Sequence, residues 1–289
     1  MKNLSLVLSG GGARGIAHIG VIEELEKQGF NIHSIAGTSM GSLVGGIYAA
    51  GKLNEFKEWI LNLDKLDVFK LIDFTLIDNG LINGDKVFSE LREFIPEINI
   101  QDLNINYLAI ATDLTNRQEI VFDEGNLLKA IRASVSIPSI FTPVRKDKAI
   151  LVDGGVINNI PINHAKRVDN DILIAVNVNA DIPLPEQKKN EETEKHSFYQ
   201  SLIKKFNNSL YKLLAHDKKN GLGRFDIMND SFEIMRDELV KLSLKNNPPD
   251  ILIETPRDIC SIYDFYKADE LIEMGQKATA QSMKDYKNK

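Results

Sequence analysis

A serine lies at the centre of a G-x-S-x-G motif, and this motif has the clearest chemical meaning in the sequence. It runs from Gly37 to Gly41, follows the short apolar segment Ser34–Ala36 and precedes the small, apolar segment Ser42–Ala50. A strand, a sharp turn and a helix would hold the hydroxyl of Ser39 at the carboxyl end of the strand, where glycines relieve crowding around a nucleophile. The alternative is that Ser39 only caps the N-terminus of the helix.

A glycine-rich run precedes the first predicted helix. Residues 10–15, Gly-Gly-Gly-Ala-Arg-Gly, match G-x-G-x-x-G after a short apolar strand. Such a run suits a dinucleotide, but a dinucleotide site also needs an acidic residue at the end of the second strand, and none is present there. The same backbone amides could instead form an oxyanion hole. A tight turn that binds no ligand is the third interpretation.

A serine nucleophile needs a base, and the sequence offers two candidates. Asp153 follows the predicted strand Ile150–Val152 and precedes Gly154 and Gly155, so it lies at a carboxyl strand end, where ligands gather in open α/β sheets. Of the five histidines, His164 alone follows a strand and turn where a triad histidine could lie. The alternative for Asp153 is a simple turn in which its carboxylate bonds its own backbone.

Composition excludes several classes of protein. The 289 residues carry a net charge of −6, which argues against a nucleic-acid binder held by phosphate contacts. Cys260 is the only cysteine, so no internal disulfide or cysteine zinc cluster is expected, and the sequence contains neither an H-E-x-x-H motif nor an EF-hand loop that would bind a metal. No apolar run approaches the ~20 residues of a membrane span, and the N-terminus lacks a signal peptide's features. We expect a cytoplasmic protein with at most transient membrane-surface contact.

Strand and helix patterns alternate along the chain, which predicts an α/β fold with a mostly parallel sheet. We expect one domain over residues 1–289, with a helical excursion at about 183–247. The predicted strands are Leu4–Leu8, Ser34–Ala36, Tyr107–Thr112, Ile120–Phe122, Ile150–Val152, Ile172–Val178 and Ile251–Ile253. The predicted helices are Ile16–Gln28, Ser42–Ala50, Asn54–Leu63, one from Asp85, Leu127–Ala133, Ser231–Leu244 and Tyr263–Lys284.

The excursion holds a stripe of apolar residues with basic neighbours. Phe198, Leu202, Phe206 and Leu210 recur at helical spacing within Phe198–Leu214, after the polar segment Glu186–Lys195. A basic amphipathic helix can lie on an anionic membrane or act as a lid. The alternative is that the stripe packs on the domain as core.

Taken together, the motifs resemble the patatin-like phospholipase family. The glycine run, the G-x-S-x-G motif and the Asp-Gly-Gly triplet occur in that order, each after a strand. The match extends to Ala133–Pro138 with Phe141–Pro143, to Asn158–Pro161, and to a final strand and helix. The similarity thus covers most of the chain except about residues 183–247, and four motifs in register make it specific.

The resemblance implies a three-layer α/β/α fold and a Ser–Asp dyad that hydrolyses acyl esters of lipids. By position, Ser39 is the nucleophile and Asp153 the base. The resemblance places the oxyanion amides at Gly11 and Gly12 and gives Arg14 a role in steadying the loop or a substrate phosphate. The supporting glycines are Gly10, Gly15, Gly37, Gly41, Gly154 and Gly155. The implied partner is a fatty-acyl ester or phospholipid, with no cofactor, no metal and no nucleic acid.

Two rival functions use the same residues. In one, Ser39 works with His164 and an acid in an ordinary triad, and loss of the histidine would abolish activity. In the other, the loop from Gly10 to Gly15 binds a nucleotide or lipid without catalysis, and Ser39 would not react with an active-site phosphonate.

Overall fold

The computed structural model describes residues 2–71, 84–138, 140–184 and 224–288. These residues form an eight-stranded sheet in the order β5-β6-β3-β2-β1-β7-β8, with β4 paired to β3. The five consecutive strands β3, β2, β1, β7 and β8 are parallel. The strands are β1 Lys2–Leu8, β2 Phe30–Thr38, β3 Asn106–Asp113, β4 Gln118–Phe122, β5 Val144–Lys146, β6 Ala149–Asp153, β7 Ile172–Ala180 and β8 Ile251–Pro256.

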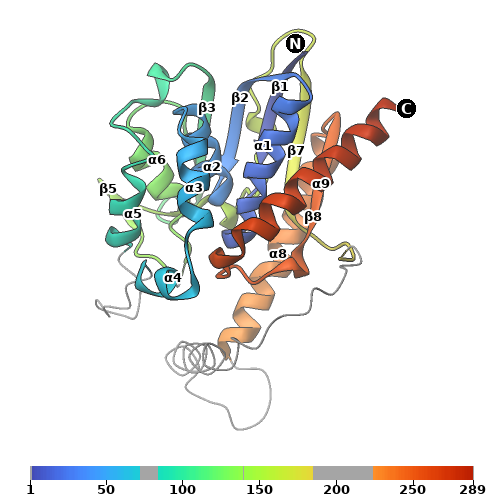
Figure 1. The fold of residues 1–289 in the computed structure, drawn as a ribbon. Coiled ribbons are helices and arrows are strands. Elements are labelled where there is room, and N and C mark those ends of the chain that lie inside the picture. Colours follow the sequence, from blue (N-terminus) through green and yellow to red (C-terminus); the bar gives the residue numbers. More distant parts are fainter. Residues whose placement is uncertain (1, 72–83, 139, 185–223, 289) are drawn as a thin grey trace, which may run out of the picture.

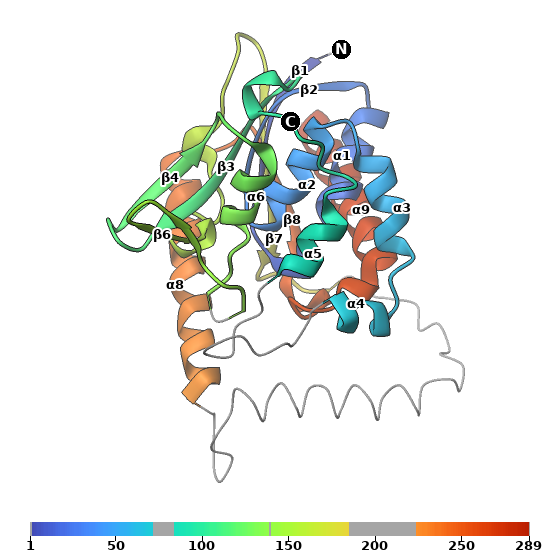
Figure 2. The ribbon, with the colours of Figure 1, turned by 90° about the vertical axis from the view of Figure 1, so that its left-hand side faces the viewer.

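Helices cover both faces of the sheet. Figures 1 and 2 show α1, α2 and α9 on one face and α8 on the other, so the expected three-layer α/β/α fold is confirmed. Alternate residues of β1 divide between the layers: Leu6 and Leu8 join the core under α1 and α2, whereas Val7 packs with Val240 of α8. The helices are α1 Ala17–Lys27, α2 Met40–Ala49, α3 Leu53–Leu61, α4 Lys65–Leu71, α5 Asp85–Leu91, α6 Leu127–Ser134, α8 Arg224–Asn246 and α9 Ala268–Lys287.

The contact between α1 and α9 depends on two glycines. A side chain at Gly20 would overlap the carbonyl of Ile272, and one at Gly275 would overlap the carbonyl of Ala17. The two helices therefore approach to backbone contact, which fixes the layer behind β1.

Strand β3 brings the ends of two other strands together. One edge of β3 pairs with β4; on the other edge, Ile110 pairs with Thr38 of β2 and the next residue, Ala111, pairs with Asp153 of β6. Because β2 is parallel to β3 and β6 is antiparallel, their carboxyl ends meet head to head. This register places Ser39, the residue after β2, beside Asp153.

Helix α8 has an unusual distribution of side chains. Its N-terminal part extends beyond the carboxyl ends of the strands (Figure 1), and its C-terminal part is packed through Val240 and through Ser243, whose hydroxyl donates to the Ile160 carbonyl. Seven large apolar side chains of α8 are between 39% and 65% exposed, and we call them together the outer face of α8: Ile227, Met228, Phe232, Ile234, Met235, Leu239 and Leu242.

Most of the expected elements are confirmed, with several differences. α8 begins at Arg224 rather than Ser231, and α9 begins at Ala268 rather than Tyr263. β2 is longer than Ser34–Ala36, so His33 lies within a strand rather than before it, and the short elements α4 and β5 were not predicted. The stripe Phe198–Leu214 and the segment Glu186–Lys195 lie outside the described residues. In the described part of the chain, no helix has both the length and the apolar character that crossing a bilayer requires.

Candidate active site

Ser39 occupies a strained turn between β2 and α2. Its φ of 53° and ψ of −125° are unfavourable for a residue with a side chain, and such strain is found where a site demands a particular geometry. A side chain at Gly41 would overlap the backbone of Leu8, so only glycine lets α2 begin this close to β1. Ser39 is 4% exposed and makes no capping hydrogen bond through its side chain, contrary to the helix-cap interpretation.

Asp153 is buried at the end of β6 with one carboxylate oxygen unused. Oδ1 accepts a hydrogen bond of 2.7 Å from the Gly155 amide, whereas Oδ2 has no partner within hydrogen-bond geometry among the described residues. Burial raises the pKa of Asp153 to about 6, and the nearby Ser39 hydroxyl, the Gly155 amide and the charge of Arg236 oppose this rise. The expected turn bond is therefore present, and it leaves the second oxygen available as a base.

A third segment connects Ser39 to Asp153. The Ser134 hydroxyl, at the end of α6, accepts a hydrogen bond of 2.9 Å from the Ser39 amide. Two residues later, the Ser136 carbonyl accepts one of 2.9 Å from the Asp153 amide. Residues 133–138 support the family resemblance in the sequence, but only the structure gives them this positioning role.

The glycine loop lies directly against Ser39. A side chain at Gly10 would come within 3.0 Å of the Ser39 Cβ. The Gly10 amide donates to the Asn159 carbonyl at 3.0 Å, and the Gly10 carbonyl accepts from the amide groups of Asn159 and Asn179 at 3.3 and 2.6 Å. Sequence reasoning missed Asn179 as an anchor of the loop.

Two backbone amides of this loop are left free. The Ala13 amide donates to the Ile262 carbonyl at 2.9 Å, but the amides of Gly11 and Gly12 have no acceptor among the described residues. Gly12 has a φ of +56°, a conformation that glycine adopts without strain. The family resemblance places the expected oxyanion hole at these same amides.

Arg14 stabilises the glycine loop through its side chain. Its guanidinium, 5% exposed, donates to the carbonyls of Gly11 and Arg257 at 3.4 Å each and lies 3.6 Å from the carboxylate of Glu233 on α8. Of the two roles expected for Arg14, these contacts match the steadying of the loop.

The three histidines that the structure describes make their contacts elsewhere. The Nε2 of His164 lies 2.6 Å from the carboxylate of Glu119 on β4, and no contact joins it to Ser39 in the described structure. His18 is fully buried, its Nε2 donates to the Ser9 carbonyl at 2.8 Å, and burial lowers its pKa to about 4. His33 lies 2.9 Å from Asp171. Among the described residues, the geometry thus brings Asp153, rather than a histidine, to Ser39.

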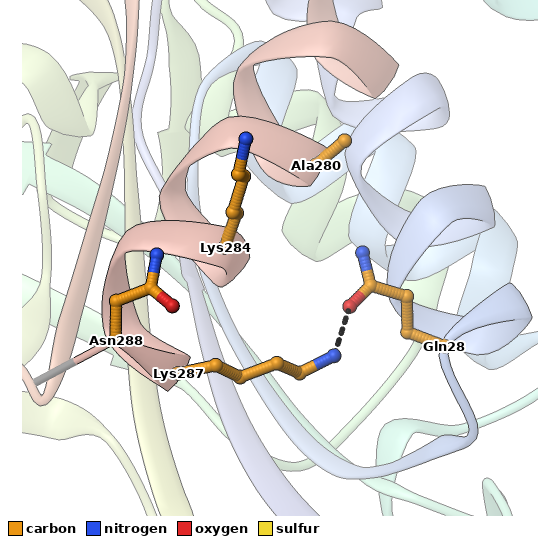
Figure 3. Close-up of a pocket in the computed structure, with 5 residues that line it drawn as sticks. All are labelled: Gln28, Ala280, Lys284, Lys287 and Asn288. Carbon is orange, nitrogen blue, oxygen red and sulfur yellow. Dashed lines mark hydrogen bonds between the residues drawn. The ribbon is translucent and has the colours of Figure 1, made fainter.

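A shallow pocket of about 400 Å³ lies at the other end of the molecule. Figure 3 shows it between the end of α1 and the last turns of α9, where Lys287 donates to Gln28 at 3.3 Å. Gln28 follows the end of α1, a helix that returns from the carboxyl to the amino ends of the strands. This pocket is therefore separate from Ser39 and Asp153.

A comparison with protein families decides the identity of this arrangement. The family model described as patatin-like phospholipase matches residues 6–166, which is more than half of the chain and includes the glycine loop, Ser39 and Asp153. The chain belongs to the patatin-like phospholipase family. This patatin-like protein is accordingly a hydrolase of lipid acyl esters.

Known proteins agree with this membership. An uncharacterized NTE family protein of Mycobacterium tuberculosis is 30% identical over 98% of this patatin-like chain and 92% of its own length. Lysophospholipase NTE1 of Scheffersomyces stipitis is 32% identical over 61% of this chain, which is 12% of its own length. The crystal structure of VipD from Legionella pneumophila superposes with a TM-score of 0.50 at 15% identity, over 99% of this chain and 67% of that one, and supports the fold.

Proposed function

We propose that this patatin-like protein hydrolyses fatty-acyl esters of phospholipids or lysophospholipids with a Ser39–Asp153 dyad. The observation that carries the proposal is the meeting of β2 and β6 on one edge of β3, because it sets a strained serine beside a buried aspartate. The raised pKa of Asp153, about 6, makes this carboxylate a better base than an exposed one while leaving it ionised at neutral pH.

Each step of the reaction has a group suited to it. Asp153 accepts the Ser39 proton on its unpartnered Oδ2 as the serine oxygen attacks the acyl carbonyl. The amides of Gly11 and Gly12 donate to the oxyanion that develops. Asp153 then returns the proton to the departing alcohol, which leaves an acyl group on Ser39, and a water activated by the same carboxylate releases the fatty acid.

We also propose a transient contact between the outer face of α8 and the membrane surface. The exposed apolar side chains lie on a helix that extends from the same end of the sheet as Ser39 and Asp153. Insertion of these side chains into the interfacial region would bring the site to its lipid substrate without a membrane span. The cytoplasmic location stays a prediction.

Covalent labelling tests the proposed nucleophile. A fluorophosphonate should label the wild-type protein on the peptide that contains Ser39, and Ser39→Ala should lose both the label and esterase activity. Ser89→Ala, on an exposed residue of α5, is the matched control and should keep both. Absence of label on Ser39, with measurable nucleotide affinity, would support the non-catalytic alternative, and substantial hydrolysis by Ser39→Ala would disprove the assignment.

A further inference from the structure

The inward side of α8 is charged where the helix passes the site. Glu233, Arg236 and Asp237 follow one another at helical spacing and are only partly exposed, whereas the apolar residues around them face outward. α8 also contacts the turn Gly154–Val156, which directly follows Asp153. This arrangement, with charges inside and apolar groups outside, calls for an explanation, because burying a charged group costs free energy unless the group is paired.

Arg236 is the least satisfied member of this group. Its NH2 atom lies 3.5 Å from Glu233 Oε1 and 4.0 Å from Asp237 Oδ1, and its buried Nε has no hydrogen-bond acceptor among the described residues. Both carboxylates have a second cation: Arg257 lies 2.6 Å from Asp237, and Arg14 lies 3.6 Å from Glu233. A buried donor without an acceptor is costly in a folded protein.

Arg236 shares each of its two carboxylates with another arginine. Three guanidinium groups, those of Arg14, Arg236 and Arg257, share two carboxylates, and the further negative charge of Asp181 acts on the Arg257 side. Arg236 is also close enough to Asp153 for its charge to lower the pKa of that residue. Arg236 and Arg257 each have a buried Nε without an acceptor among the described residues, but only the charge of Arg236 acts on Asp153. An anionic group on the substrate could therefore bind Arg236 close to the site.

We infer that Arg236 binds the phosphate group of the substrate, so that the site prefers acyl esters that carry a phosphate over neutral ones. The planar guanidinium can offer its two terminal nitrogens together to two phosphate oxygens. In a glycerophospholipid the short glycerol backbone separates this phosphate from the acyl ester that the dyad attacks. The inference rests on the proposed function and adds a specificity residue to it.

A ratio of two activities tests the inference. The substrates are 1-oleoyl lysophosphatidate and 1-oleoylglycerol in the same detergent micelles, which share the acyl ester and differ in the phosphate. Arg236→Gln should lower the ratio of their kcat/KM values by about 10- to 100-fold, because it removes a charge-assisted pair of hydrogen bonds. Arg236→Lys should restore part of the ratio. Arg145→Gln, on the exposed edge strand β5, should leave it unchanged.

The ratio separates recognition from chemistry. Any effect of Arg236 on the Asp153 base, or on folding, lowers both activities alike and cancels. An unchanged ratio in Arg236→Gln, or a wild-type enzyme that prefers the neutral ester, would overturn the inference alone. A wild-type protein that hydrolyses neither ester and takes no fluorophosphonate label would instead overturn the proposed function and, with it, the inference.

Inorganic phosphate distinguishes the two sources of this anion. Inhibition of 1-oleoylglycerol hydrolysis by millimolar phosphate in the wild type, relieved in Arg236→Gln, would show that the site accepts phosphate without its lipid. A changed substrate ratio without such inhibition would assign the site to the lipid headgroup.

Discussion

Asp153→Asn should remove activity and stabilise the protein at neutral pH. The buried carboxylate is ionised at pH 7 although its environment favours the protonated form, since its pKa rises from an ordinary 3.8 to about 6. The folded state thus binds the proton more tightly than the unfolded state, and its free energy of unfolding falls as the pH rises from 3.8 to 6. An asparagine has no proton to lose and avoids this penalty.

The magnitude follows from the size of the shift. About two pKa units at 1.36 kcal/mol each amount to about 3 kcal/mol of stability lost by the wild type above pH 6, of which roughly half is already lost at pH 5. The asparagine keeps the contact with the Gly155 amide through Oδ1, and its amide nitrogen can donate to the Ser39 hydroxyl. The stability advantage of Asp153→Asn should therefore grow by about 1 kcal/mol between pH 5 and pH 8.

Urea unfolding of both proteins at pH 5 and pH 8 measures this difference. In parallel, kcat/KM for a p-nitrophenyl acyl ester should rise with pH through a midpoint near 6 in the wild type and fall by about 10³-fold or more in Asp153→Asn. A midpoint near 4 and a pH-independent stability difference would refute the idea that burial tunes this base.

Three further predictions follow from the neighbours of the dyad. His164→Ala should keep at least half of the activity, because its imidazole faces Glu119; a 10³-fold loss would establish the triad instead. Ser134→Ala should lower kcat about tenfold while Ser134→Thr retains it, since the Ser39 amide loses its acceptor only in the first; equal kcat values would contradict this role. Met235→Ser with Leu239→Ser should reduce hydrolysis of vesicle lipids several-fold and spare a short-chain ester, with Tm within about 2 °C of the wild type; a fall of many degrees would show that this face is packed.

The sequence predicts the parts of the site that short motifs carry. Ser39, Asp153 and the glycine loop each follow a strand, and the rule that ligands gather at carboxyl strand ends brings them to one region. Their assignment as a dyad came from the resemblance, because the residues alone left His164 open. The structure adds the head-to-head register on β3, which no local pattern contains.

The residues that hold the site in place could not be predicted from the sequence, and the reason is physical. Asn179 bonds Gly10 across 169 positions in the chain, and Arg236 meets Glu233 on an inward helix face that polarity alone assigns to solvent. Helical periodicity predicts α8 but assigns its apolar side to the core, whereas the structure exposes it. Elements of a few residues, such as β5 and α4, give too little periodicity to detect.

Because β2 and β6 meet head to head on β3, this one strand sets the distance between the two halves of the proposed dyad. The spacing between Thr38 and Asp153 equals one step between Ile110 and Ala111, so it does not depend on the length of chain that joins β2 to β6. Loops inserted on either side of β3 should be accommodated, as long as its pairings persist. A single residue inserted between Ile110 and Ala111 would instead push the two strand ends apart and shift their side chains out of register. Enzymes built on this frame are thus free to vary their connecting loops while the reacting pair stays fixed.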